Sequence, residues 1–313
     1  MCEKGFEKPK LFRIFKYYYT KTGALTCINS SKFFMYLDRL KTDNIFVKNE
    51  VVKLESLTGI PTRKGLENAI ISEGQIVNVV SNKYAHLTNE NFFLEVERAL
   101  IESDINYVTQ SINRGNRSFA VDYILQDENF VVNVKTGADE ILPMLRFTNG
   151  YDGSTAPSGR FGFFRKVCSN GLHVAETKVG FKIKHRGNIE SIVIPRINEM
   201  VQMFMKNEYY DIKRKFDVLA ETPIQDLSRF VQVVCNDTNI FKFEKSDKNP
   251  EPSKLAQMVI DTITNESLIL NYDPNLWIGY NAFNEVLHKE MKKTFENQRQ
   301  FDNRLLESVM TLS

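Results

Sequence analysis

The sequence predicts an α+β protein in which a twisted, largely antiparallel sheet packs against helices and is followed by a helical C-terminal region. Between residues 75 and 186, short runs of alternating apolar and polar residues are separated by turn residues, a pattern typical of strands. From residue 195 onward, apolar residues recur three and four positions apart, which indicates amphipathic helices. The 313 residues are 42% hydrophobic, enough for a sizeable core.

Three segments are expected. Residues 1–50 mix short apolar runs with Lys and Tyr, which predicts strands or a hairpin that join the main sheet. Residues 51–220 form the α+β core domain, and residues 221–313 form the helical region. Within that region, residues 224–235, 252–264 and 276–310 are read as helical, and the polar stretch 242–253 is read as a flexible link.

The core begins with a strand at 75–80 and a helix that Thr88 caps, in which Phe92, Val96, Ala99 and Leu100 share one face. A hairpin follows, with strands 106–113 and 117–125 joined around residues 114–116.

Further strands are predicted at 140–148, 160–167 and 179–186, with Asn170 and Gly171 forming the turn between the last two. Pro143 favours an edge or bulged position for the first of these. A long helix over 195–218, with Pro195 in its first turn, closes the core and buries Ile197, Met200, Val201 and Phe204.

Several classes of site are disfavoured. The four cysteines form no C-x-x-C pair, the four histidines belong to no metal-binding motif, and no nucleotide-binding glycine motif occurs. We therefore expect no metal, no cofactor and a reducing compartment. With no signal-like N-terminus and no apolar run of about 18 residues, a cytoplasmic protein without a membrane partner is expected.

The strongest local signal is charge. Residues 160–186 hold seven basic residues and one acidic residue in a chain whose net charge is +2. Strand periodicity places Lys182, Lys184 and Arg186 on one face and Phe181, Ile183 and His185 on the other. Such a basic stripe can follow a phosphate backbone, with Phe161, Phe163, Phe164 and Tyr151 as stacking surfaces for unpaired bases. The alternative is the solvated face of an edge strand beside a phenylalanine core.

Candidate phosphate contacts follow from this stripe and from the predicted hairpin tip, where arginines could grip phosphate or be ordinary loop charges. They are Arg114, Arg117, Arg160, Arg165, Lys166, Lys182, Lys184 and Arg186.

The segment around Asp152, Gly153 and Ser154 has two interpretations. Asp and Ser can act as acid, base or nucleophile, but a nucleophile needs a positioned base. The alternative is a tight turn in which Asp152 or Ser154 binds the backbone and Gly153 supplies an unusual dihedral angle. Cys168 is either a reactive thiol among basic neighbours or a small buried apolar residue.

Two motifs carry a resemblance to a known family. The first is residues 149–154 and the second is residues 165–172, with flanking features that extend the similarity over about residues 70–300. Together they resemble a family of uncharacterised proteins with a domain of unknown function found in phages, prophages and plasmids. The resemblance implies a mobile-element setting in a bacterial host and transfers no catalytic residue or cofactor. The motif residues are Asn149, Asp152, Gly153, Ser154, Cys168, Asn170 and Gly171, and Tyr151 stands where members often carry His.

The function expected from these observations is that of an accessory protein that binds single-stranded DNA or RNA as a homo-oligomer, supporting annealing, recombination or replication. No catalytic residues are assigned, and a non-enzymatic protein is favoured. Two alternatives stay open: a virion-associated or host-interaction protein, and a hydrolase or nuclease that uses Asp152 with Asp122.

Overall fold

The computed structural model describes residues 38–126, 132–133, 140–165, 170–173, 180–204, 208–246, 249–291 and 295–313. Its centre is a seven-stranded antiparallel sheet with the strand order β10-β8-β7-β5-β4, to which β6 adds beside β7 and β9 beside β8. The strands are β4 (Tyr107–Arg114), β5 (Ser118–Leu125), β6 (Val132–Asn133), β7 (Glu140–Gly150), β8 (Ser158–Arg165), β9 (Asn170–His173) and β10 (Gly180–Lys182).

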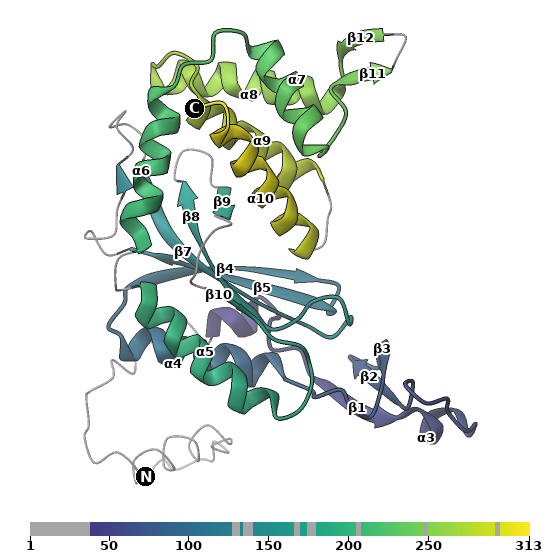
Figure 1. The fold of residues 1–313 in the computed structure, drawn as a ribbon. Coiled ribbons are helices and arrows are strands. Elements are labelled where there is room, and N and C mark those ends of the chain that lie inside the picture. The colour runs from purple at the N-terminus through teal and green to yellow at the C-terminus, as the bar shows by residue number, and fades with distance from the viewer. Residues whose placement is uncertain are drawn as a thin grey trace, which may run out of the picture.

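Helices lie on both sides of this sheet. In Figure 1, α4 (Asn89–Glu102) and α5 (Ile189–Phe204) lie below it, and the C-terminal helices lie above it. These helices are α6 (Glu208–Glu221), α7 (Leu227–Thr238), α8 (Lys254–Leu270), α9 (Leu276–Glu290) and α10 (Phe295–Met310). The predicted α+β class, with an antiparallel sheet and a helical C-terminal region, is confirmed.

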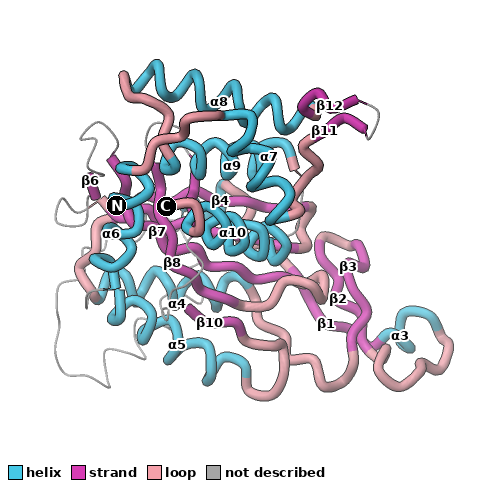
Figure 2. The backbone as a smooth tube through the Cα atoms, turned by 45° about the horizontal axis from the view of Figure 1, so that its top comes forward, coloured by secondary structure: helices cyan, strands magenta, loops and turns pink. Residues whose placement is uncertain are grey.

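A smaller three-stranded sheet projects from this body (Figures 1 and 2). It consists of β1 (Asn49–Lys53), β2 (Asn68–Ser72) and β3 (Gln75–Val80), with the short helix α3 (Leu54–Thr58) between β1 and β2. The turn from β2 to β3 uses Glu73 and Gly74, both at positive φ, as a two-residue hairpin requires.

The expectation that residues 1–50 add strands to the main sheet is wrong where the structure describes them. Residues 38–42 are helical, and β1 pairs with β2 of the small sheet instead. Residues 1–37 lie outside the described residues.

The first half of the core follows the prediction. The strand at 75–80 is β3, and Thr88 caps α4, its Oγ1 accepting a hydrogen bond from the backbone N–H of Asn91 at 3.1 Å. Phe92, Val96, Ala99 and Leu100 are all buried. The predicted hairpin is β4 and β5, in full antiparallel register.

Three structural predictions made at proline or Asn-Gly positions are corrected: those at Pro143, at Asn170 and Gly171, and at Pro195. Pro143 lies in β7, a central strand with β8 on one side. On its other side, the pairing with β5 stops at Met144 and the pairing with β6 resumes at Ile141, so Pro143 occupies a local gap. Missing one N–H therefore costs little at this position.

Asn170 and Gly171 form no turn, because both belong to β9 and pair with Arg165 and Phe164 of β8. The connection between β8 and β9 falls on residues 166–169, outside the described part of the chain.

The predicted helix over 195–218 corresponds to two helices, α5 and α6. The first begins at Ile189, so Pro195 lies inside it rather than in its first turn. The start follows Asn188, whose backbone and side-chain oxygens both lie within hydrogen-bond distance of Ser191. Ile197, Met200 and Val201 are buried as expected, whereas the Phe204 side chain is not described.

The C-terminal helices are confirmed, with one correction. Residues 242–253, expected as a flexible link, contain the two-stranded hairpin of β11 (Glu244–Ser246) and β12 (Asn249–Pro252).

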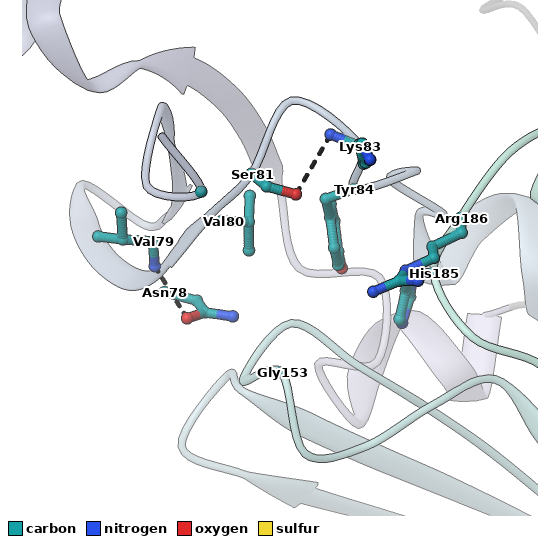
Figure 3. Close-up of a pocket in the computed structure, with 10 residues that line it drawn as sticks. Asn78, Val79, Val80, Ser81, Lys83, Tyr84, Gly153, His185 and Arg186 are labelled. Carbon is teal, nitrogen blue, oxygen red and sulfur yellow. Dashed lines mark hydrogen bonds between the residues drawn. The ribbon is translucent and has the colours of Figure 1, made fainter. Parts of the chain in front are cut away.

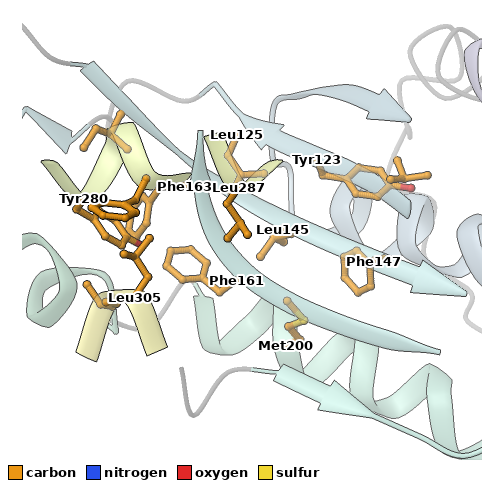
Figure 4. Packing of buried hydrophobic residues seen from close by; sticks show 14 of the residues in the cluster. Tyr123, Leu125, Leu145, Phe147, Phe161, Phe163, Met200, Tyr280, Leu287 and Leu305 are labelled. Carbon is orange, nitrogen blue, oxygen red and sulfur yellow. The ribbon is translucent and has the colours of Figure 1, made fainter. Parts of the chain in front are cut away.

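The core joins the sheet to the C-terminal helices through a chain of aromatic rings. The ring of Phe163 on β8 lies 5.1 Å from that of Phe216 on α6, which lies 4.5 Å from Trp277 on α9. Figure 4 shows Phe161 and Phe163 of β8 pointing toward Tyr280, Leu287 and Leu305 of the helices. Because these rings are fully enclosed, sheet and helices share one core.

Candidate nucleic-acid interface

The candidate site lies at the end of the main sheet where four connections meet. The β4–β5 turn touches the β7–β8 loop, since Tyr151 donates its backbone N–H to the carbonyl of Arg117 at 2.7 Å. Residues 84–85 run antiparallel to residues 185–186, with a bridge between Tyr84 and Arg186 and a backbone hydrogen bond of 3.0 Å from Ala85 to His185. A third backbone hydrogen bond, from Ile183 to the carbonyl of Pro157 at 2.9 Å, joins the β7–β8 loop that follows the first motif to the basic stripe.

The first motif holds the sheet to the start of α4. The side-chain amide of Asn149 donates to the carbonyl of Leu87 at 3.0 Å and to Oδ1 of Asn89 at 2.9 Å. Asn89 in turn donates its backbone N–H to the hydroxyl of Tyr151 at 2.8 Å. Asn149 and Tyr151 are both fully buried, so their role in the described structure is to position backbone.

Asp152, Gly153 and Ser154 form the tight turn that was one of the two sequence interpretations. Oδ1 of Asp152 accepts from the backbone N–H groups of Ser154 and Thr155 at 2.9 and 2.8 Å, and Oδ2 accepts from the Ser154 hydroxyl at 2.7 Å. Gly153 has φ +78°, a conformation that side chains disfavour. The carboxylate is thus committed to shaping the loop.

An open hollow of about 330 Å³ lies between this turn and the small sheet (Figure 3). Gly153 closes one side and Asn78 of β3 another, and Lys83 and Arg186 contribute the cationic side chains. Tyr84 and His185 line the hollow as a stacked pair, with ring centroids 4.8 Å apart and planes inclined by 22°. The hollow therefore offers a polar, positively charged lining.

The imidazoles near the hollow are neutral at pH 7. Burial lowers the pKa of His185, whose Nδ1 lies 3.1 Å from the carbonyl oxygen of Ala85. Burial, reinforced by the neighbouring His185, lowers the pKa of His86 to about 4. His86 is further held by Asn49, whose Oδ1 contacts Nε2 of the ring. Positive charge at the hollow consequently comes from Lys83 and Arg186.

The basic stripe is exposed as predicted. Regular strand structure ends at Lys182, but the alternation continues through the irregular residues that follow. Lys182, Lys184 and Arg186 are exposed, whereas Phe181, Ile183 and His185 are half-buried on the opposite side.

The other predicted phosphate contacts are exposed, half-buried or outside the described residues. Arg117 is exposed at the β4–β5 turn, and Arg160 is half-buried on β8. Arg114 is half-buried, and its guanidinium lies 4.0 Å from the ring centroid of Phe295. Lys166 lies outside the described residues, as does Cys168 of the second motif.

The assignment of Arg165 to the interface is corrected. Its side chain is completely buried, and Nη1 donates to Oε2 of Glu266 at 2.6 Å. Arg165 also stands at the far end of β8, because it pairs with Ile141 while the first motif begins at the other end of β7. A polyanion on the surface cannot reach this guanidinium.

The two halves of the family motif therefore lie at opposite ends of the β7–β8 pair. Asn149, Asp152, Gly153 and Ser154 flank the hollow end, whereas Asn170 and Gly171 pair with β8 at the Arg165 end. Asp122, the second carboxylate of the nuclease alternative, is buried in a bidentate pair with Arg146. The described side chains thus bring no Asp152–Asp122 pair together.

The stacking surfaces expected from the sequence are not available. Phe161, Phe163 and Tyr151 are buried, and half-buried Phe164 packs against the cluster of Ile124, Leu142 and Met144. A nucleic-acid strand bound at this surface would contact the cationic side chains, and its bases would not stack on these aromatic rings.

Sequence reasoning missed Asn78, Lys83 and Tyr84, which the fold brings beside the stripe. For Lys83 and Tyr84 the available signal was their position between a strand and the Thr88 helix cap, a kind of connection that often carries function. Asn78 lies within β3, and no local signal marked it. Their contact with residues 153, 185 and 186 depends on tertiary structure.

Comparison with known proteins gives a family. A model for a domain of unknown function, DUF932, matches residues 76–310. The chain belongs to this DUF932 family. No curated protein and no solved structure gives a match.

Among the described residues, no helix is both long and apolar enough to cross a membrane. No group of three or more His, Cys, Asp and Glu side chains there is arranged to hold a metal ion.

Proposed function

We propose that this protein binds single-stranded nucleic acid through its phosphate backbone along Lys182, Lys184 and Arg186. The observation that carries the proposal is the exposure of all three side chains on one side of a backbone whose opposite side faces the core. Lys182 and Lys184 are alternate residues on extended backbone, roughly 7 Å apart. The chain bends at His185, where Arg186 donates its backbone N–H to the carbonyl of Lys184 at 2.7 Å, so the three cations follow a bent line rather than a point.

The line continues beyond the stripe. Arg186 lines the hollow together with Lys83. Arg117 is also exposed, and its carbonyl oxygen accepts a hydrogen bond from the backbone N–H of Tyr151. Neither His86 nor His185 adds charge at pH 7, so attraction for phosphate comes from lysine and arginine alone. A flexible single strand can follow this bent path more readily than a stiff duplex.

Burial of the candidate stacking rings supports a base-independent mode of binding. With Phe161, Phe163 and Tyr151 enclosed, the roughly 1 to 3 kcal/mol that each stacked base can contribute is absent. Phosphate neutralisation then supplies the affinity, which makes it strongly dependent on salt. The cellular context we propose is support of annealing, recombination or replication in a phage or plasmid setting.

Fluorescence anisotropy with labelled oligonucleotides tests the proposal. Oligo-dT, oligo-dA and an abasic strand of equal length should bind within about twofold of one another, because stacking contributes little. The logarithm of affinity should fall linearly with the logarithm of salt concentration, at a slope of about −0.7 per phosphate contacted. An absence of binding to all three strands at low salt by folded protein would overturn the proposal.

A duplex of the same length provides the specificity control. Tighter binding of the single strand at equal salt supports the assignment to single-stranded nucleic acid. Preference for the duplex would reject that assignment and retain phosphate binding alone.

A further inference from the structure

Exposed apolar side chains gather at the tip of the small sheet. Leu57, Ile60 and Leu66 are 46%, 66% and 49% exposed. Helix α3 buries none of its residues, so this tip does not pack against the body. The same stretch carries the exposed cations Arg63 and Lys64. Grouped exposed apolar residues with a charged rim are typical of contact surfaces.

A second apolar patch lies at the C-terminal end of α8. Leu268 and Ile269 are 75% and 72% exposed, the highest values among the large apolar side chains of the described residues. Residues 255–288 contain no Lys or Arg, whereas Asp261 and Asp273 are exposed near the patch. Asp261 is two helical turns before Leu268 and so shares its side of α8.

These two patches are complementary in charge and lie at opposite ends of the molecule. Figures 1 and 2 both show α3 on the projecting small sheet, far from the end of α8 that leads into α9. One molecule cannot bring its own patches together, so a contact between them needs a second copy. A contact that uses one tip and one α8 end is heterologous and leaves a free patch of each kind for further copies.

We propose that the residue 57–66 tip of one copy docks on the α8 end of a second copy, giving head-to-tail self-association. The apolar side chains of each patch cover those of the other, and Arg63 and Lys64 face Asp261 and Asp273. The two patches together offer only five large apolar side chains, so we expect an interface below the standard size of about 1,600 Å². The association is therefore reversible and weak, and it grows with protein concentration and weakens with salt.

Two blocked variants test this geometry by sedimentation velocity. Leu57→Ser/Ile60→Ser removes two apolar side chains from the tip, and Leu268→Ser/Ile269→Ser removes both apolar side chains from the α8 patch. All four positions are exposed, so both variants should fold. Wild type should show a weight-average mass that rises with concentration past the dimer, while each variant alone stays monomeric. An equimolar mixture of the two should form dimers and stop there, because each variant retains one functional patch.

Two variants in which the charges of one patch are reversed test the electrostatic part of the contact. Arg63→Glu/Lys64→Glu should weaken self-association, as should Asp261→Lys/Asp273→Lys, and mixing the two reversed proteins should restore hetero-association. A wild type that stays monomeric at all concentrations overturns the proposal. So does association that survives in either blocked variant alone, or a mixture that fails to form dimers. None of these results depends on nucleic acid, which is left out of the samples.

Discussion

The guanidinium of Arg165 on β8 and the carboxylate of Glu266 on α8 form an ion pair of 2.6 Å inside the protein. Their side chains are 0% and 6% exposed, and the pair joins positions 101 residues apart in the chain. Arg165 also lies 5.8 Å from the Trp277 ring, so it takes part in packing between the sheet and the C-terminal helices. Arg165, which the sequence suggested as a phosphate contact because of its charge, thus connects the main sheet to the C-terminal helices inside one core.

Replacing Arg165 by Met should lower the free energy of unfolding by about 3 to 5 kcal/mol, because the buried carboxylate of Glu266 would lose its ion pair with Arg165. The Arg165→Met/Glu266→Met double variant should cost much less than the sum of the two single changes. Urea denaturation of the four proteins measures this coupling. Additive effects would show that the pair contributes little.

Replacing Gly150 by Ala should lower the free energy of unfolding by about 1 to 3 kcal/mol. An added Cβ would stand 2.5 Å from Cβ of Thr155 and 3.1 Å from the carbonyl oxygens of Arg117 and Thr155. The change should cost less in a Thr155→Gly background, where the closest atom is absent. Thermal denaturation compares the two backgrounds, and equal costs in both would contradict this contact as the cause.

Glu97 should make stability fall as the pH rises. Burial between α4 and the sheet raises the pKa of its carboxyl to about 7, although Tyr107 donates a hydrogen bond to it. The folded state therefore holds a proton that the unfolded state releases near pH 4.5, and deprotonation through pH 7 costs up to about 3 kcal/mol.

The Glu97→Gln variant isolates this contribution, since every other titrating group is common to both proteins. It should match wild type near pH 4 and become progressively more stable than wild type up to about pH 8. Denaturant titrations across this range give the difference. A constant difference at all pH values would exclude a proton held at Glu97.

His86 should stay neutral until the pH falls to about 4, because burial and His185 both disfavour its charged form. An NMR titration of the ring should show this midpoint, and protonation of His86 should not change oligonucleotide affinity between pH 6 and 8. A midpoint near 6.5 would show that the ring is open to solvent.

The local pattern of the sequence was enough to predict the strands and helices of the core. Thr88 as a helix cap and the hairpin around residues 114–116 depend on neighbouring residues, so they could be read directly. The errors fall where tertiary pairing overrides a local breaker. Pro143 fits a central strand because its partner changes there, and Asn170 and Gly171 extend a strand because Arg165 and Phe164 pair with them.

The candidate site was only partly predictable for the same reason. Alternation alone indicated that Lys182, Lys184 and Arg186 share an exposed side. The burial of Arg165 depends on Glu266, and the place of Lys83 beside the stripe depends on the bridge between Tyr84 and Arg186. Both relationships join residues about a hundred positions apart, beyond the reach of periodicity.

Lys182, Lys184 and Arg186 are proposed to bind nucleic acid. The most direct measurement is the anisotropy of a labelled single strand with Lys182→Glu/Lys184→Glu/Arg186→Glu against Lys242→Glu/Lys245→Glu/Lys254→Glu. The second variant makes the same charge change at exposed positions near the β11–β12 hairpin. We expect the stripe variant to lose at least about tenfold in affinity and about 2 units of salt slope, while the control stays close to wild type. Equal losses in the two variants, or none in the stripe variant, would contradict the claim.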